Sequence, residues 1–308
     1  MGSRSHKQGV ILIAGPTASG KSALALLLAE RLDGTIINAD SMQVYRELRI
    51  LTARPALEDE RRVPHRLYGH ISVTERYSAG RYREEAARAL AEAREADRLP
   101  IFVGGTGLYF SALTEGLSPI PAIPTDVRSA VRKRFETIGR ERFFAELAVR
   151  DPDTAGRLRI SDTQRVLRAT DVLEATGTPL STWQRVSGRP LVGGPNVRSY
   201  VVAPPREILH GRLERRFRWM IEAGALDEVR ALAGIDPSLP AAKALGVPQL
   251  LRYLAGEVAL EAAINEANIA TRQYAKRQAT WFRNRTDWKW LDDLELSNLI
   301  SQIRAELT

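Results

Sequence analysis

Gly15-Pro-Thr-Ala-Ser-Gly-Lys-Ser22 matches the phosphate-loop pattern G-x-x-x-x-G-K-[ST] and decides the fold of this sequence. The apolar run Val10 to Ala14 precedes it and a helical pattern over Ala23 to Leu32 follows, which is the strand–loop–helix order that the pattern requires. In such a loop, backbone N–H groups at a helix N-terminus form a cradle for phosphate oxygens. The pattern adds the charge of Lys21 and makes Ser22 a magnesium ligand. The stretch predicts a bound di- or triphosphate and leaves open which one.

The composition is that of an ordinary globular protein. Of the 308 residues, 44% are hydrophobic and 27% are charged, and no apolar stretch approaches the roughly 18–20 residues of a membrane span. The sequence has no cysteine, which excludes disulfides, thiolate–zinc sites and thiol nucleophiles. These features predict no membrane partner and fit a cytoplasmic protein.

The chain is also basic, with a formal net charge of +8 and a sequence pI near 10.0. A mononucleotide enzyme does not need this excess of positive charge, whereas a polyanionic partner such as nucleic acid would use it. Composition alone leaves a merely solvated basic surface as the alternative.

Short strands alternate with helices in the first hundred residues. Strands are expected at 35–39 and 100–103, and a helix at 84–98. The alternation predicts an α/β fold with a P-loop NTPase-like parallel sheet core and helices on both faces. Because ligands sit beyond the carboxyl ends of such strands, the phosphate loop, Asp40-Ser41 and Gly104-Gly-Thr106 should meet at one crevice.

Two joints rich in proline and glycine, 118–124 and 190–195, interrupt this pattern. Between them, the arginine-rich stretch 126–177 has a helical pattern with almost no strand signal, and the chain after Pro205 is again helical almost to its end. The simplest organisation is an α/β catalytic core at 10–117 and 198–308, with a helical insertion domain at 118–197 that binds a partner.

Asp40 ends the second expected strand, and three roles fit it there. A strand-end aspartate can hold water around magnesium in phosphate-loop proteins. A carboxylate in a crevice can instead act as a general base, and an aspartate can cap the N-terminus of a helix that starts at Ser41. Position alone does not choose among these roles.

Five motifs, in this order along the chain, together resemble the bacterial tRNA dimethylallyltransferase family, also called tRNA isopentenyltransferases. They are GPTASGKS at 15–22, DSMQVYR at 40–46, VGGTGLY at 103–109, DTQRVLR at 162–168 and TRQYAKRQATWFR at 271–283. The resemblance implies transfer of a dimethylallyl group from dimethylallyl diphosphate to N6 of an adenosine beside the tRNA anticodon. Pyrophosphate would be the second product, and Mg²⁺ would assist.

The resemblance also implies a residue for each reacting group. Thr17 would donate to the bridging oxygen of the leaving group, Arg216 would clamp the diphosphate, and Asp40 would accept a proton from the adenine amino group. Together with the loop N–H groups and Mg²⁺, these residues would stabilise the charge of the departing pyrophosphate. The residues implied on the diphosphate are Gly15, Thr17, Ala18, Ser19, Gly20, Lys21 and Ser22, with Ser22 on the metal.

Two helical patterns are candidates for contact with RNA. Ser161-Asp-Thr-Gln164 has the form of a capping box, and in the helix that follows, Gln164 and Arg168 share a face opposite Val166. In the helix near 265–285, basic and aromatic side chains fall on opposite faces, which also suits phosphate contact. The resemblance implies contacts with the tRNA anticodon stem-loop from Asp40, Ser41, Met42, Gln43, Thr106, Arg128, Gln164, Arg165, Val166, Leu167, Arg168, Arg272, Lys276, Arg277 and Arg283.

Other functions share some of these features. A related enzyme could prenylate free AMP, ADP or ATP, a small-molecule kinase could use an arginine-rich lid, and an RNA-binding protein could carry a degenerate loop. The intact Lys21-Ser22 pair weighs against the last. The motifs favour the RNA-modifying prenyltransferase, which is expected to act as a monomer.

Overall fold

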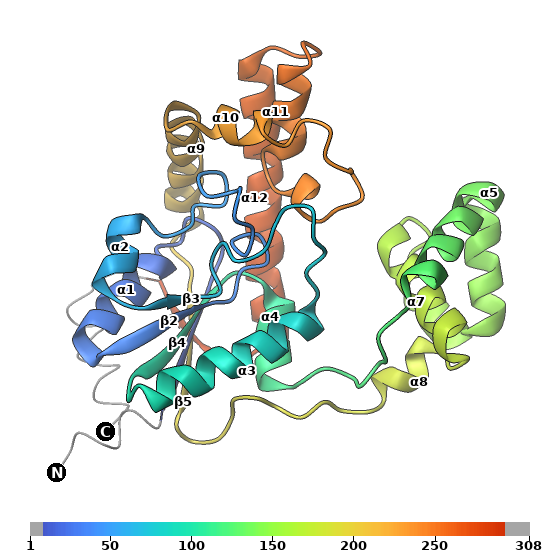
Figure 1. Cartoon of the computed structure of the whole chain (residues 1–308), viewed down its shortest axis with the longest axis horizontal. Helices are drawn as coiled ribbons and strands as arrows, with labels where there is room; N and C mark the ends of the chain where they lie inside the picture. The colour runs from blue at the N-terminus through green and yellow to red at the C-terminus, as the bar shows by residue number, and fades with distance from the viewer. Residues whose placement is uncertain (1–8, 293–308) are drawn as a thin grey trace. The chain divides into compact units, whose positions relative to one another are not determined.

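The computed structural model describes residues 9–292 and divides the chain into two compact units (Figure 1). Of the described residues, 9–114 and 191–292 form the first unit, and Glu115–Pro190 form the second. The expected insertion was 118–197. The segment after Pro190 joins the first unit because the N–H groups of Leu191 and Val192 both donate to Leu113 O, at 2.7 and 3.0 Å.

The first unit is built on a parallel sheet. Within residues 9–292 the sheet has six strands in the order β3-β2-β4-β1-β5-β6, so β1 lies inside it, with Ile13 opposite Val103 of β4 and Tyr200 of β5. All five residues of β1 are buried, as expected for a strand covered on both faces. The strands are β1 Val10–Ala14, β2 Gly34–Asn38, β3 His65–Arg66, β4 Leu99–Gly104, β5 Val197–Val202 and β6 Lys289–Leu291.

Helices cover both faces of this sheet, as the alternation of strands and helices predicts (Figure 1). Ile11 and Ile13 of β1 pack with Leu24 and Leu28 of α1, whereas the intervening Leu12 packs in the cluster formed by α3, α4 and α12. The helices of this unit are α1 Lys21–Leu32, α2 Leu57–Arg62, α3 Ala79–Glu95, α4 Gly107–Thr114, α9 Arg206–Glu222, α10 Ala225–Arg230, α11 Val247–Leu254 and α12 Leu260–Arg285, with a 3₁₀ turn at Ala241–Lys243.

Some elements differ from the sequence-based expectation: strand β3 was not expected, helix α3 ends at Glu95 instead of residue 98, and the start of α3 and the whole of β6 also differ. Helix α3 starts at Ala79, five residues before Glu84, because the Ser78 hydroxyl caps it by accepting from Arg81 N at 3.1 Å. Strand β6 lies in the stretch that was expected to be helical, and it pairs with β5 through Val201 and Trp290. A three-residue strand has too few residues to show a period, so only pairing reveals it.

The second unit is helical and has its own hydrophobic core. Phe143 and Leu147 of α5 pack there against Val166 and Leu173 of α7. The expected capping box at Ser161 is wrong: the residue that caps α7 is Asp162, whose carboxylate accepts from Arg165 N at 3.3 Å. The helices are α5 Thr125–Arg150, α6 Pro152–Ala155, α7 Thr163–Thr176 and α8 Leu180–Gln184. In residues 9–292 no helix combines the length and apolarity needed to cross a membrane.

Candidate active site

The phosphate loop lies between β1 and α1 and has the backbone that an anion cradle requires. A Cβ atom on Gly15 would lie 2.3 Å from Val202 O of β5, so only glycine fits at this position. Gly20 has φ 100°, in the left-handed region that favours glycine, and no side chain caps the helix that starts at Lys21. The N–H groups of the first turn of α1 are therefore left for a ligand at the helix N-terminus.

Two side chains of the loop, Lys21 and Ser19, are suited to meet a charged ligand. Lys21 Nζ donates to Pro16 O at 3.1 Å, and burial lowers the pKa of its ammonium to about 8, while the charge of Asp40 opposes and that of Arg216 reinforces this lowering. Ser19 is fully buried, and its hydroxyl has no hydrogen-bond partner within residues 9–292. A phosphate group would meet the needs of both side chains.

Two arginines of helix α9 form hydrogen bonds with the phosphate loop. Arg216 Nη2 donates to Thr17 Oγ1 at 2.6 Å, and Arg212 Nη1 donates to Ser19 O at 3.4 Å. Burial lowers the pKa of the Arg216 guanidinium, and the Asp40 carboxylate works against that lowering. Sequence reasoning did not single out Arg212 and so missed its contact with the loop. Its spacing of four residues from Arg216 puts both side chains on one face of α9, but only the packing of α9 shows that this face meets the loop.

Asp40 lies in a tight turn after β2. Asp40 Oδ1 accepts from Met42 N at 2.9 Å, and Asp40 N donates to Asn38 Oδ1 at 2.8 Å. No helix follows Ser41, so Asp40 does not cap a helix, and one of the three roles left open by the sequence is removed. The bonds hold the carboxylate in place through one oxygen atom.

The glycine-rich turn after β4 packs against this aspartate turn. Thr106 Oγ1 accepts from Ser41 N at 2.9 Å and lies 3.2 Å from Ser41 Oγ. A Cβ atom on Gly104 would lie 2.1 Å from the Ala39 carbonyl group, so the close approach of the two turns depends on glycine. As the sequence predicts, Asp40-Ser41 and Thr106 come together at the carboxyl ends of neighbouring strands.

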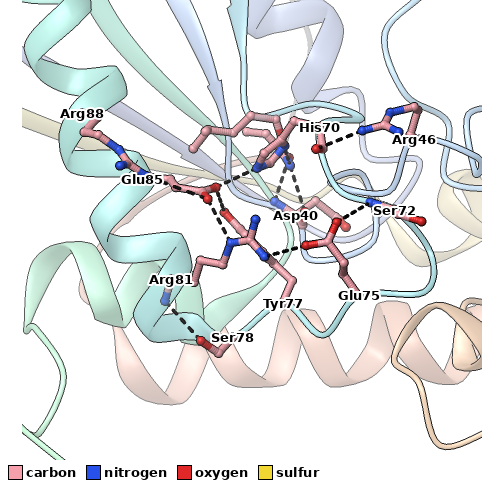
Figure 2. Close-up of polar contacts among 12 residues, drawn as sticks. Asp40, Arg46, His70, Ser72, Glu75, Tyr77, Ser78, Arg81, Glu85 and Arg88 are labelled. Carbon is pink, nitrogen blue, oxygen red and sulfur yellow. Dashed lines mark hydrogen bonds and ion pairs between the residues drawn. The ribbon is translucent and has the colours of Figure 1, made fainter. Parts of the chain in front are cut away.

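The loop that follows Asp40 is supported by a polar cluster around Glu85 of α3 (Figure 2). Its carboxylate accepts from Tyr77 Oη at 2.6 Å and from Arg81 Nε at 3.0 Å, and it lies 2.7 Å from His70 Nε2. Ile71 follows His70 directly, and its carbonyl oxygen accepts a hydrogen bond from Arg46 N at 2.8 Å. Glu85 thus anchors the segment on which the loop after Asp40 rests, a role that sequence reasoning did not find.

A cavity of about 300 Å³ opens at the junction of these turns. Thr17, Asp40 and Arg216 all line it, and the part of the cavity beside these three residues is called its polar end below. Its walls also include a set of apolar side chains from the loop at 51, from α9 and from the segment before α11. These are Leu51, Leu213, Phe217, Met220, Ala244 and Leu245.

Among the residues expected to contact RNA in the first unit, Ser41, Met42 and Arg277 also line this cavity. Gln43 is not among the residues that line the cavity. Its Nε2 instead donates to Thr52 O and Ala53 O at 2.9 and 2.8 Å, and these bonds stabilise the neighbouring loop. The basic side chains that were expected on one face of α12 have different surroundings. Arg272 pairs with Glu214 of α9 at 2.7 Å, the Arg283 guanidinium lies 5.3 Å from the Trp290 ring centroid, and Lys276 is exposed.

In the second unit, the expected RNA-contact residues fall into two groups. Gln164, Arg165 and Arg168 of α7 are exposed, as is Arg128 of α5, and the charges of Arg128 and Arg168 both act on Asp171. Burial raises the pKa of Asp171, and the two arginines oppose this effect. Leu167 is half-buried. Val166 is 2% exposed in the core of the unit, so its side chain is not free to contact RNA.

Comparison with known proteins places these observations in one family. The family model described as IPP transferase matches residues 43–285. A tRNA dimethylallyltransferase of Azorhizobium caulinodans is 54% identical over 308 residues, covering 98% of each chain, and one of Bradyrhizobium sp. strain ORS 278 is 52% identical over 298 residues, covering 96% of this chain and 97% of its own.

Solved structures agree. The crystal structure of the tRNA isopentenylpyrophosphate transferase from Bacillus halodurans matches with a TM-score of 0.69, 32% identity and 97% coverage of each chain. A eukaryotic dimethylallyltransferase acting on tRNA matches with a TM-score of 0.79 and 28% identity, over 96% of this chain and 77% of its own.

Proposed function

Because this chain belongs to the IPP transferase family, we propose that it transfers a dimethylallyl group to tRNA. The donor is dimethylallyl diphosphate, and the acceptor is N6 of the adenosine 3′-adjacent to the anticodon. The products are N6-dimethylallyladenosine in tRNA and pyrophosphate. The observation that carries the proposal is the cavity in which Thr17 of the phosphate loop, Asp40 and Arg216 face one space.

The reaction exchanges one carbon–oxygen bond for a carbon–nitrogen bond. The bond from the dimethylallyl C1 to the diphosphate oxygen breaks as C1 bonds to N6, and N6 loses a proton. The adenine amino group is a weak nucleophile because its lone pair is delocalised into the ring. Asp40 would orient this group and accept its proton as general base. The turn that fixes one oxygen of the carboxylate through Met42 N supports this role.

The polar end of the cavity would receive the diphosphate. Donors that are held in place before the reaction stabilise developing charge without reorganisation, and this is usually the largest single contribution to catalysis. Here the donors are Lys21, Arg216, the Thr17 hydroxyl and the N–H groups at the start of α1. The buried Ser19 hydroxyl, which has no hydrogen-bond partner among the described residues 9–292, supports an anion at this place.

Mg²⁺ fits the same end. Ser22 lies exposed at the start of α1, so its hydroxyl is available to the metal beside the phosphate loop. Mg²⁺ is commonly held by one or two protein oxygens, phosphate oxygens and water. When bound there by Ser22, the metal would neutralise charge on the leaving pyrophosphate.

RNA would contact both units. The exposed Arg128, Gln164, Arg165 and Arg168 support a contact of the second unit with the tRNA anticodon stem-loop, in which phosphate charges would be neutralised by arginine. Leu167 could contribute at the edge of this surface. In the first unit the proposed contacts are Asp40, Ser41, Met42, Thr106, Lys276, Arg277 and Arg283. Arg272 and Gln43 would act indirectly, by fixing the positions of Glu214 and of the loop at Thr52 and Ala53.

Two further expectations belong to this proposal. The first is that the enzyme works as a monomer. We place the enzyme in the cytoplasm, because both proposed substrates are found there.

Transfer of label to RNA tests the function. The protein is incubated with Mg²⁺, dimethylallyl diphosphate labelled in the prenyl group, and an anticodon stem-loop that carries adenosine next to the anticodon. We expect label in the RNA and an equal amount of pyrophosphate. A stem-loop with guanosine at that position is the control. Label in added AMP but none in RNA would instead identify a free-nucleotide prenyltransferase.

A further inference from the structure

Gln278 is a buried polar side chain that touches the phosphate loop from a distant part of the sequence. It lies on α12, and 5% of its surface is exposed. Its Oε1 accepts from Thr17 N at 3.0 Å, and its Nε2 donates to Gly105 O at 2.9 Å. One carboxamide therefore links the loop after β1 to the turn after β4.

We propose that Gln278 is a positioning residue that sets the place of the Thr17 hydroxyl in the cavity. The proposal rests on the proposed function, in which the diphosphate leaves beside Thr17. Thr17 is held from two sides, at Oγ1 by Arg216 of α9 and at its N–H by Gln278 of α12. A misplacement of about 1 Å at a reacting group can cost on the order of 100-fold in rate, so the second bond matters to catalysis.

The neighbouring glycine is shaped for this contact. A Cβ atom on Gly105 would lie 2.0 Å from Gln278 Nε2, so any other residue at this position would push the carboxamide away. The second glycine of the motif at 103–109 is therefore needed because it leaves room for the Gln278 side chain from α12.

The position of Gln278 separates it from the residues proposed to contact RNA. Its neighbours Lys276 and Arg277 are exposed on α12, whereas Gln278 points into the protein, and both ends of its amide are bonded to backbone. If Gln278 contacted RNA, its replacement would weaken RNA affinity. If it holds the loop, its replacement should instead change kcat and the KM for dimethylallyl diphosphate.

The two bonds fix the orientation of the amide, which gives a sharp test. A protonated glutamic acid can copy both bonds, because its carbonyl accepts from Thr17 N and its O–H donates to Gly105 O. An ionised glutamate only accepts, so it faces Gly105 O with two acceptors and no proton. Burial raises the pKa of such a carboxyl above its ordinary value of about 4.3. The variant Gln278→Glu should therefore work better at low pH.

Three variants of the full chain make the comparison. Gln278→Glu tests the proton, Gln278→Met keeps a similar volume but makes neither bond, and Asn265→Glu adds the same charge at an exposed position of the same helix. The titratable groups around the site (Asp40, Lys21 and Tyr274 among them) are the same in each variant. Steady-state transfer to the anticodon stem-loop is measured over a range of dimethylallyl diphosphate concentrations, which gives kcat and KM, and RNA affinity is measured in parallel, both at about pH 6 and about pH 8.5.

We expect Gln278→Glu to lose on the order of 10- to 100-fold in kcat/KM for dimethylallyl diphosphate at the higher pH. At the lower pH its rate relative to the parent protein should recover several-fold. The relative rate of Gln278→Met should be low and the same at both values, and Asn265→Glu should match the parent. The RNA dissociation constant should stay within about twofold for all variants.

The proposal is overturned if Gln278→Met keeps the parent kcat and the parent KM for the diphosphate, or if its loss lies in RNA affinity alone. A relative rate of Gln278→Glu that does not change with pH would overturn the proton argument. If Gln278→Glu fails to fold, as judged by its melting curve, Gln278→Met decides by the same constants. If the parent protein transfers nothing, the proposed function fails, and binding of inorganic pyrophosphate to the parent and to Gln278→Met then tests the positioning role by itself.

Discussion

Replacement of Lys21 by methionine should stabilise the ligand-free protein while it removes a charge that the diphosphate needs. Burial lowers the pKa of the Lys21 ammonium from 10.5 to about 8, which means that the folded protein holds this charge at a cost. At about 1.4 kcal/mol for each pKa unit, this lowering corresponds to about 3 kcal/mol. Because the side chain is partly exposed and also donates to Pro16 O, a bond that methionine cannot make, we expect a net gain of about 1–2 kcal/mol.

The dependence on pH isolates this lysine. Below about pH 8, Lys21 is protonated in both the folded and the unfolded chain, so its cost is fully present. Between about pH 8 and 10.5 the unfolded chain binds a proton that the folded chain does not, so the stability of the parent protein rises with pH. The stability advantage of Lys21→Met should therefore be largest near neutral pH and shrink as the pH rises through this window.

Urea unfolding of both proteins at several pH values between about 7 and 10 measures this difference. The m-values should agree, so that differences in midpoint report stability alone. Binding of inorganic pyrophosphate should be lost in the variant. A variant that is less stable than the parent at neutral pH, or a difference that does not change up to pH 10, would refute the account of Lys21 as a charge held at a cost for its ligand.

Asp40→Asn should keep its affinity for RNA and diphosphate but lose on the order of 100-fold or more in single-turnover rate, and an unchanged rate would remove Asp40 as the base. Glu85→Ala should lower the free energy of unfolding by about 2–3 kcal/mol, because Tyr77 and Arg81 lose their shared acceptor, and a loss below about 0.5 kcal/mol in urea would contradict the anchoring role. Arg168→Glu should weaken binding of the anticodon stem-loop and reduce the slope of log K against log salt by about 1, whereas the exposed Arg142→Glu on α5 serves as control; equal effects of the two would indicate a non-specific basic surface.

The phosphate loop and the sheet could be predicted from the sequence because the residue patterns that indicate them are local. Val10 to Ala14 forms β1 with the predicted bounds, and the loop lies between it and α1. The motif GPTASGKS requires particular backbone angles at Gly15 and Gly20, and both angles follow from residue type. The meeting of Asp40 with Thr106 was predictable for the same reason, since parallel strands bring their carboxyl ends to one edge.

Contacts between distant segments were not predictable in this way. The three-residue β6 is recognisable only by its pairing with β5, and the role of Glu85 depends on a loop that folds back on α3. Arg212 could be told from a solvated arginine only once α9 was placed against the loop. In each case the partner is far away in the sequence, and periodicity within one element carries no information about it.

By itself, the sequence determined the α/β core and the family that its motifs resemble, and it predicted a bound phosphate ester, because these properties lie in short stretches whose chemistry is set by residue type. Only the tertiary structure decided which side chains share the cavity. It placed Arg216 on Thr17, left Gln43 and Arg272 with partners inside the protein, buried Val166, and brought Gln278 to the phosphate loop. The physical reason is that a buried polar group must find a partner in space, and the packing of helices on the sheet determines which partner is near.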